Sequence, residues 1–557
     1  MHKIYEPALQ LADKFIADRL VSRIWDRDIA AWGAAPGSAD AASIQTRLGW
    51  LDVASTMAPE LERVEALGLA AREEGIQAVY LLGMGGSSLC AEVLRQVYGI
   101  ADGYPELVVL DTTDGSTIAA AADAMDPVRT LILVASKSGG TVEVASMERY
   151  FWRRMTEALG ARAGRQFVAV TDPGTALHRL AGDRGYREVF LNPPDIGGRF
   201  SALSLFGLVP AALIGAPVRD IHAAGEAMAE GCRQENRENA GLMLGAFIGA
   251  TLEEGRDKLT VSLAPSLASL GLWIEQLVAE STGKHGKGAL PFVDEPLGSP
   301  SEYASDRAFI AVSTERDGPD AEKLARLEKA GHPVLRLSTR IGGLGSEFFR
   351  WEFATAVAGA ALGINPFDEP NVSEAKEKTR ALLDAFAAKE SLAEPDPTAQ
   401  NDQVAVFSRT FRGETPAAVV RAALDSVRPP DYVAFLSYLP AGSDTEVAIG
   451  EARAGIRVKK LVGSTFGVGP RYLHSTGQYH KGGPNTAVAF VITADDTTTT
   501  GIPDAGYSFN VLKRAQALGD VETLEAHDRR AVRIHLKDAA AGGRALGQLF
   551  AEALKER

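Results

Sequence analysis

Cysteine is scarce in this chain of 557 residues, which contains only Cys90 and Cys232. Two cysteines exclude a disulfide framework and a thiolate metal site, so we expect both to be small buried hydrophobic residues. Long apolar runs are absent too, and the first residues, Met1–Glu6, contain no apolar signal core. We therefore expect a cytoplasmic protein without a membrane partner.

Basic charge is in deficit, because 58 Lys and Arg stand against 72 Asp and Glu, which gives a net charge of −14. Neither nucleic acid nor an anionic membrane attracts such a protein, so no nucleic-acid partner is expected. An anionic metabolite is not excluded, since one local cluster of cations and N–H groups can override the global sign. The nine histidines form no H-x-x-E-H or H-x-H cluster, and no metal site is predicted.

The pattern that is present is that of an α/β protein. The 46% of hydrophobic and 23% of charged residues are typical of a globular enzyme. Short strands that are apolar throughout alternate with helical stretches, which predicts mostly parallel sheets covered by helices on both faces. The expected strands are Ala78–Gly83, Leu107–Asp111, Thr130–Ala135, Phe167–Thr171, Glu188–Leu191, Lys258–Leu263, Ala308–Val312, Val334–Leu337, Tyr432–Leu436, Lys459–Val462 and Thr486–Thr493.

Four blocks follow from this pattern. Apolar residues at helical spacing predict an N-terminal helical segment over residues 1–70. A first α/β domain is expected over 71–240, and the first part of a second over 241–390. The polar, proline-bearing stretch Ala387–Thr398 is typical of a linker. An α/β segment over 399–557 is expected to complete the second domain.

The most informative stretch follows the strand Thr130–Ala135 and reads Ser136-Lys137-Ser138-Gly139-Gly140-Thr141-Val142-Glu143. Glycines let the backbone approach an anion, hydroxyl and N–H groups donate hydrogen bonds, and the start of a helix adds partial positive charge. The loop is neither a Walker A nor a G-x-G-x-x-G motif. Ser and Thr also cap helices for structural reasons, so a capped turn without a ligand is the alternative.

A second turn of this kind closes the first strand and reads Gly83-Met84-Gly85-Gly86-Ser87-Ser88. In parallel sheets, ligands bind beyond the carboxyl ends of strands, where the strand order reverses. Two Gly/Ser turns at strand ends of one sheet are therefore expected to share one ligand site.

The two turns resemble those of the phosphoglucose isomerase (glucose-6-phosphate isomerase) family, which has the sugar isomerase (SIS) fold. Four further elements resemble the family's motifs: Gly197–Ser201 (GGRFS), Glu280–Lys284 (ESTGK), Asn365–Val372 (NPFDEPNV) with Lys376 after it, and Leu473–Tyr479 (LHSTGQY). The resemblance implies two SIS-type domains. It also implies reversible conversion of D-glucose 6-phosphate to D-fructose 6-phosphate through an enediolate, in glycolysis and gluconeogenesis. It implies a hexose 6-phosphate as substrate and no cofactor, and it leaves a homodimer open.

The resemblance also implies roles for individual residues. Glu280 carries the proton between C1 and C2, Arg199 stabilises the enediolate, and His474 and Lys376 open the sugar ring. The residues implied in binding the substrate and its phosphate are Gly85, Gly86, Ser87, Ser136, Lys137, Ser138, Thr141 and Glu143.

Without the resemblance, the local sequence also allows ordinary surface or structural roles for these residues. Glu280 could be a solvated glutamate at a helix end, Arg199 a surface arginine, and Lys376 part of a charged helix face. A carboxylate at the C-terminal end of a helix faces a repulsive dipole, which favours the protonated form and suits a base acting near neutral pH. His480, six residues after His474, is the rival for ring opening.

Three departures from the family pattern bear on these expectations. The histidine element follows the linker, as if the second domain were rearranged; this resembles the isomerase portion of transaldolase/glucose-6-phosphate isomerase fusion proteins. Glu369 stands where the family has glutamine and is expected to turn away or to pair with a lysine. Ser138 and Gly140 replace threonines. The alternatives are therefore a dual phosphoglucose/phosphomannose isomerase or a non-catalytic regulator that binds sugar phosphates.

Overall fold

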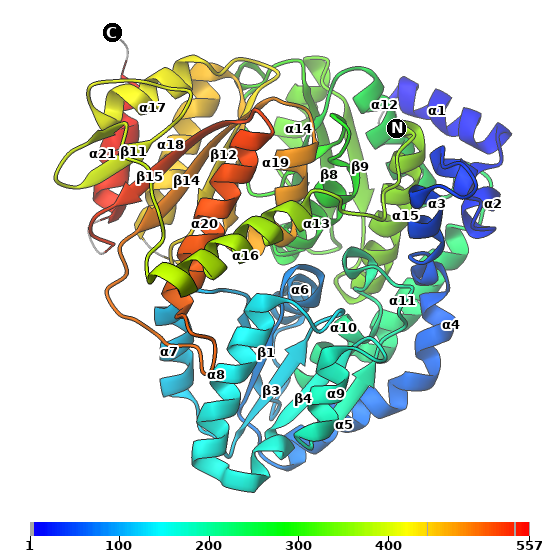
Figure 1. Cartoon of the computed structure of the whole chain (residues 1–557). Coiled ribbons are helices and arrows are strands. Elements are labelled where there is room, and N and C mark those ends of the chain that lie inside the picture. Colours follow the sequence, from blue (N-terminus) through cyan, green and yellow to red (C-terminus); the bar gives the residue numbers. More distant parts are fainter. Residues whose placement is uncertain (1–4, 443, 540–541, 556–557) are drawn as a thin grey trace.

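The computed structural model describes residues 5–442, 444–539 and 542–555. Its N-terminal part is helical, as expected, and lies at one side of the molecule (Figure 1). The helices are α1 (Glu6–Ala17), α2 (Leu20–Trp25), α3 (Ala39–Gln45), α4 (Val53–Met57) and α5 (Leu61–Glu73).

The first sheet is parallel and has the strand order β2-β1-β3-β4-β5. The five predicted strands are confirmed to within one residue at each end. They are β1 (Ala78–Leu82), β2 (Glu106–Leu110), β3 (Thr130–Ala135), β4 (Phe167–Thr171) and β5 (Glu188–Leu191), and the helices between them are α6 (Leu89–Tyr98), α7 (Gly115–Ala124), α8 (Val142–Leu159) and α9 (Ala176–Asp183). The order reverses between β1 and β3, so the two Gly/Ser turns flank the position where such sheets bind ligands.

The second sheet is also parallel, in the order β7-β6-β8-β9. Strands β6 (Lys258–Leu263), β8 (Arg307–Ser313) and β9 (Val334–Ser338) confirm the prediction, whereas β7 (Leu290–Phe292) was missed because three residues carry no pattern. The helices of this part are α10 (Leu205–Leu213), α11 (Val218–Gly231), α12 (Ala240–Glu253), α13 (Leu270–Thr282), α14 (Ala321–Lys329), α15 (Leu344–Leu362) and α16 (Val372–Lys389).

The C-terminal block contains a sheet of six strands in the order β10-β11-β15-β14-β12-β13. Its strands are β10 (Ala399–Gln400), β11 (Val404–Phe407), β12 (Tyr432–Ser437), β13 (Gly463–Val468), β14 (Ala487–Ala494) and β15 (Arg530–Leu536). Its helices are α17 (Pro416–Asp425), α18 (Asp444–Lys460), α19 (Gly477–Gly482), α20 (Phe509–Ala526) and α21 (Gly542–Ala553).

Two of the sequence predictions for this region were wrong. The strand expected at Lys459–Val462 is the end of helix α18, and the strand itself begins at Gly463. The basic residues before that point belong to the last turn of the helix, where cations are favourable. The linker expected from Ala387 begins later, because α16 continues to Lys389.

Among the described residues, no strand of the C-terminal block pairs with a strand of the second sheet. The block contacts the second domain through side chains and through a backbone hydrogen bond from the Gly286 N–H to the Gly482 carbonyl at 2.9 Å. It has a hydrophobic core of its own, and Gly463 at the start of β13 lies directly against Phe292 of β7. This close approach places the block beside the second domain. The domain boundaries given above stay a prediction.

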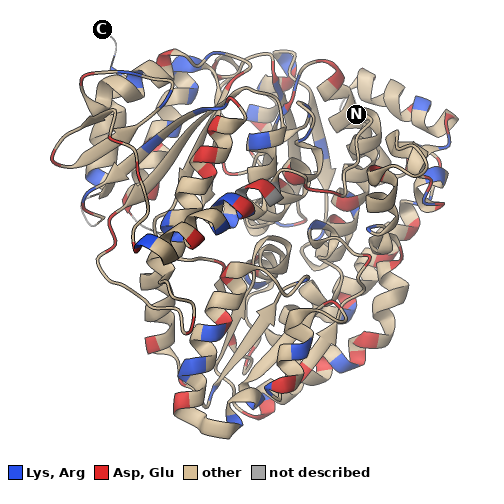
Figure 2. Ribbon diagram, viewed as in Figure 1, with Lys and Arg blue, Asp and Glu red and all other residues tan. Residues whose placement is uncertain are grey.

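Other composition-based expectations concern the surface and the cysteines. Cys90 and Cys232 are buried free thiols, as predicted. Acidic and basic residues are interspersed along the visible helices (Figure 2). Among the described residues, no helix is long and apolar enough to cross a membrane.

Candidate functional site

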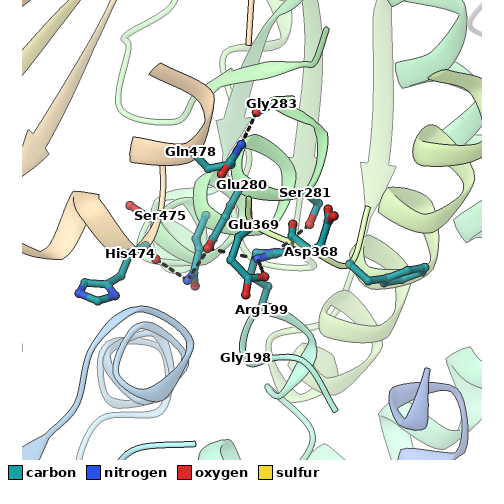
Figure 3. A network of polar contacts seen from close by, with 12 residues as sticks. Gly198, Arg199, Glu280, Ser281, Gly283, Asp368, Glu369, His474, Ser475 and Gln478 are labelled. Atoms are coloured by element: carbon teal, nitrogen blue, oxygen red, sulfur yellow. Dashed lines mark hydrogen bonds and ion pairs between the residues drawn. The ribbon is translucent and has the colours of Figure 1, made fainter. Parts of the chain in front are cut away.

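Arg199 and Glu280 form a buried ion pair at the centre of the site (Figure 3). Each residue is only 5% exposed, and Arg199 Nη1 lies 3.1 Å from Glu280 Oε1. The Nε of Arg199 donates to Ser281 Oγ at 3.0 Å, and its Nη2 donates to the carbonyl oxygens of Pro366 and Asp368. The guanidinium is therefore fixed on every side. Arg199 is neither a surface residue nor free to rotate.

Glu280 lies in the last turn of α13, which ends as predicted before Gly283. Burial raises the pKa of Glu280 above its usual value, although the charge of Arg199 acts in the opposite direction. The direction agrees with the sequence-based expectation, while the main cause is loss of water around the carboxylate. A carboxyl group of this kind suits proton transfer near neutral pH.

Glu369 completes the cluster, and its partners are arginines, contrary to the expected lysine. Its Oε2 accepts a hydrogen bond from Arg199 Nη1 at 3.1 Å, and its Oε1 pairs with Arg47 Nη2 at 3.3 Å. Burial opposes ionisation of Glu369, but Arg199 and Arg47 hold its pKa below the usual value. The residue that departs from the family pattern is thus part of the site.

Two further side chains tie the motifs together. Lys284 is buried and donates to the Asn365 carbonyl at 2.8 Å and to Asp368 Oδ1 at 2.5 Å. Burial lowers its pKa to about 8. Gln478 of α19 donates to the Gly283 carbonyl at 2.9 Å and accepts from the Asn371 backbone N–H at 2.9 Å. Segments far apart in the sequence therefore meet at one point.

Gly85 and Gly86 have a structural part in this assembly. A Cβ atom on Gly86 would lie 2.0 Å from the carbonyl oxygen of Gly198, and one on Gly85 would lie 2.6 Å from that of His474. Gly85 also has a φ of +54°, which disfavours a side chain. These glycines let the turn Gly85–Ser87 contact the arginine and histidine loops, and none of the three lines the cavity described below.

His474 is held by a chain of hydrogen bonds from the first domain and α20. Its Nε2 lies 2.9 Å from Glu143 Oε1, which also accepts from Gln516 Nε2 at 2.7 Å. Burial opposes ionisation of Glu143, but the charge of His474 and the hydrogen bond to it hold the pKa of Glu143 below the usual value. Glu143, expected to bind substrate, orients the histidine here. In Figure 3 the imidazole points away from Arg199.

Gln276 joins the two halves of the site. Its Nε2 donates to Glu280 Oε2 at 3.2 Å and to the backbone carbonyl of His474 at 2.7 Å. Since Gln276 and Glu280 are one helical turn apart on α13, a single side chain links the buried carboxylate to the histidine loop.

A cavity of about 440 Å³ opens beside His474. The predicted residues that line it are Ser138, Thr141, Glu143, Lys376 and His474. Helix α16 contributes Lys376 and Arg380, one turn apart, and packs against α20 (Figure 1). Neither cation has an ion-pair partner among the described residues. The cavity therefore brings hydroxyl groups and these two cations together with the carboxylates of Glu143, Glu377 and Asp384.

Two residues of the predicted phosphate loop do not line this cavity. Lys137 Nζ pairs with Asp172 Oδ2 at 2.5 Å and donates to the carbonyl of Pro194. Ser136 is buried and lies 3.4 Å from the Thr141 hydroxyl. The loop itself is placed as expected, but its lysine is already neutralised.

The rival histidine, His480, lies in the protein interior. Its Nδ1 is 2.7 Å from the Tyr432 hydroxyl, and burial lowers its pKa to about 3. It is therefore a neutral core residue, away from the cavity.

Sequence reasoning missed Gln276, Gln516, Arg47 and Arg380. Gln276 lies one turn before Glu280, so helical spacing could have indicated it. Arg380 lies one turn after Lys376 on α16, so the same spacing could have indicated it. Arg47 and Gln516 carry no local signal, because only the tertiary fold brings α20 and the N-terminal segment to the site.

Solved structures share this fold. A hypothetical protein from Thermus thermophilus matches with a TM-score of 0.55 and 23% identity over 66% of this chain and 97% of that chain. A glucose-6-phosphate isomerase from Chlamydia trachomatis matches with a TM-score of 0.54 and 19% identity over 68% and 86%. Two parallel sheets, a Gly/Ser loop after β3 and this common architecture define an α/β protein with the fold of these two structures.

Comparison with known sequences identifies the family. Residues 52–296 match the family model described as phosphoglucose isomerase. The glucose-6-phosphate isomerase of Heliobacterium modesticaldum is 32% identical over 47% of this chain and 68% of that protein. That of Rubrobacter xylanophilus is 29% identical over 56% and 84%. The chain belongs to the phosphoglucose isomerase family.

Proposed function

We propose that this protein interconverts D-glucose 6-phosphate and D-fructose 6-phosphate. The observation that carries the proposal is the buried pair of Glu280 and Arg199, with the Nε2 of Gln276 bonded to both Glu280 and the His474 loop. A base with a raised pKa beside a fixed cation is what enediolate chemistry needs, because negative charge develops on the substrate oxygens as the proton leaves carbon.

In the proposed reaction, the substrate's phosphate lies at Ser138 and Thr141, and its C1–C2 end points toward Glu280. His474, oriented by Glu143, exchanges the proton that opens the pyranose ring, and Lys376 assists from α16. Glu280 then removes the proton from C2 and returns it to C1 while Arg199 stabilises the enediolate. The hydroxyl proton of O2 passes to O1, so the carbonyl moves from C1 to C2. No step requires a metal or an organic cofactor.

Arg380 is proposed as the cation that binds the phosphate. It lines the same cavity as Ser138 and Thr141 and has no ion-pair partner among the described residues, whereas Lys137 is paired with Asp172. A guanidinium and hydroxyl groups around an anion give strong, charge-assisted hydrogen bonds.

A coupled isomerase assay with a panel of hexose phosphates tests the function. Turnover of glucose 6-phosphate, with solvent deuterium appearing at C2, is expected. Comparable turnover of mannose 6-phosphate would support the dual isomerase instead. Binding without deuterium exchange would support a sugar-phosphate-binding regulator, and light scattering of the same sample would test the homodimer.

A further inference from the structure

The charge balance around Arg199 is unusual for a site whose family pattern has a neutral glutamine at position 369. One guanidinium nitrogen, Nη1, lies 3.1 Å from carboxylate oxygens of both Glu280 and Glu369. Its positive charge is therefore divided between two carboxylates. With a neutral residue at position 369, Glu280 would be its sole carboxylate partner at that nitrogen.

Arg47 supplies a second positive charge, so that the two carboxylates face two guanidinium groups. It comes from the N-terminal helical segment, just after α3, and its Nη2 pairs with the other oxygen of Glu369 at 3.3 Å. Its Nη1 donates to the carbonyl of Phe367 at 3.1 Å and to Ser43 Oγ at 3.0 Å. Arg47 is thus held in place by the neighbouring loop and by its own helix.

We propose that Glu369 and Arg47 are positioning residues that act through Arg199. The carboxylate of Glu369 offsets part of the electrostatic effect of the Arg199 guanidinium on Glu280. Arg47 holds Glu369 in the position in which it contacts Arg199. The inference rests on the proposed function, in which Glu280 is the base. Its consequence is that Glu280 keeps enough basicity to take a proton from carbon although it touches an arginine.

The groups around Glu280 set the direction of each change. Arg199 and His474 favour its charged form, Gln276 does so through a hydrogen bond, and Glu369 disfavours it. Around Glu369, Arg199, Arg47 and Lys284 are the stabilising cations. Removing the carboxylate at position 369 strengthens the pull of Arg199 on Glu280. Removing Arg47 leaves Glu369 less neutralised and has the opposite effect.

The test is a cycle of four proteins: the wild type, Glu369→Gln, Arg47→Met and the double variant. We expect the acidic limb of the pH profile of kcat/KM to move to lower pH in Glu369→Gln and to higher pH in Arg47→Met. In the double variant, which loses one charge of each sign, the limb should return toward that of the wild type. Arg47→Lys keeps the cation and should leave the limb in place.

A merely structural role gives a different result. If both single variants lower kcat equally at every pH, with the limb unmoved, the inference is overturned. Thermal unfolding of each variant identifies any that fail to fold. If Arg47→Met is one of them, Glu369→Gln carries the test, because a limb at the wild-type pH in that folded variant overturns the inference. An inactive wild type would contradict the proposed function alone, because infrared difference spectra against Glu280→Gln follow the titration of Glu280 without turnover.

Discussion

The buried cluster of Arg199, Glu280 and Glu369 and the cavity beside His474 differ in whether their cations form ion pairs. Around Arg199, Glu280 and Glu369, every ionised side chain has an oppositely charged partner within 3.3 Å. Around the cavity, Lys376 and Arg380 have none among the described residues. Burying an unpaired charge costs free energy, so a charged side chain shielded from water needs a partner within the protein. A charged side chain at an open cavity is hydrated and can bind an anionic ligand instead.

We expect this difference in ion pairing to distinguish the residues that act on the reacting carbons from those that bind the substrate phosphate. Changes in the buried half should act mainly on kcat, because its charges meet the substrate where the transition state forms. Changes at Ser138, Thr141 and Arg380 in the cavity should act mainly on KM, because these groups are proposed to contact a phosphate that does not react. His474 and Lys376 line the same cavity but belong to ring opening, so changes there should act on kcat. The predictions below test this division, starting with the largest expected effect.

Replacing the base should have the largest effect. Glu280→Gln keeps the shape of the side chain but removes its basicity, so kcat should fall at least ~10²-fold with little change in KM. A coupled assay and deuterium incorporation at C2 would measure the loss. Near-normal turnover would remove Glu280 from the mechanism.

His474→Ala should discriminate between cyclic and open-chain substrates. Turnover of glucose 6-phosphate should fall about 10²-fold, since ring opening loses its acid–base group. Erythrose 4-phosphate, whose phosphorylated O4 cannot close a furanose ring, should be spared if it is a substrate. His480→Gln is the matched control and should not change the ratio of the two rates. Equal losses on both substrates would indicate a role for His474 in folding or binding.

The two candidate cations for the phosphate can be compared directly. Arg380→Met should raise KM by about 10-fold or more, as expected for a lost hydrogen bond to a charged group, with kcat less affected. Lys137→Met should change KM less, because the lysine already pairs with Asp172. The reverse order would assign the phosphate to Lys137.

Thr141→Val tests the loop hydroxyl. It should raise KM by an amount equivalent to about 1–2 kcal/mol, with a smaller change in kcat. Inorganic phosphate should compete with the substrate in the wild type and compete less well in the variant. A purely kcat effect would contradict ground-state binding of the phosphate at this loop.

The smallest effect on turnover is expected at His480, which should instead govern stability in acid. Its pKa of about 3 in the folded state lies below the unfolded value of ~6.5. The unfolded chain therefore binds the proton first, and the stabilisation, complete above pH ~6.5, is lost as the pH falls toward 3. The loss should be on the order of 1 kcal/mol at pH 5.5 relative to pH 8. Denaturant unfolding at both pH values should show it in the wild type. If the pH dependence were just as large in His480→Gln, it would arise elsewhere.

Most strands with a continuous apolar pattern were predictable from sequence, because burial on both faces demands that pattern locally. The short strand β11 (VAVF) has the pattern too but was missed. Strand β15 was not, since Arg530, Arg533 and His535 interrupt it. Arg533 lies inside because Glu394, from the segment after α16, pairs with it at 2.6 Å. Such a partner, 139 residues away in the chain, leaves no trace in the local sequence.

The sequence by itself determined the family and the Gly/Ser loops and proposed Glu280, Arg199, Lys376 and His474 as site residues, because short motifs specify residue type and local backbone geometry. Only the tertiary structure decided which charged side chains form ion pairs and which line the cavity without one. It assigned Lys137 to Asp172 and left Arg380 open at the cavity. It also placed Arg47 on Glu369, although α3 and the NPFDEP segment are far apart in sequence. Electrostatic pairing depends on distances through space, and those distances exist only after the chain has folded.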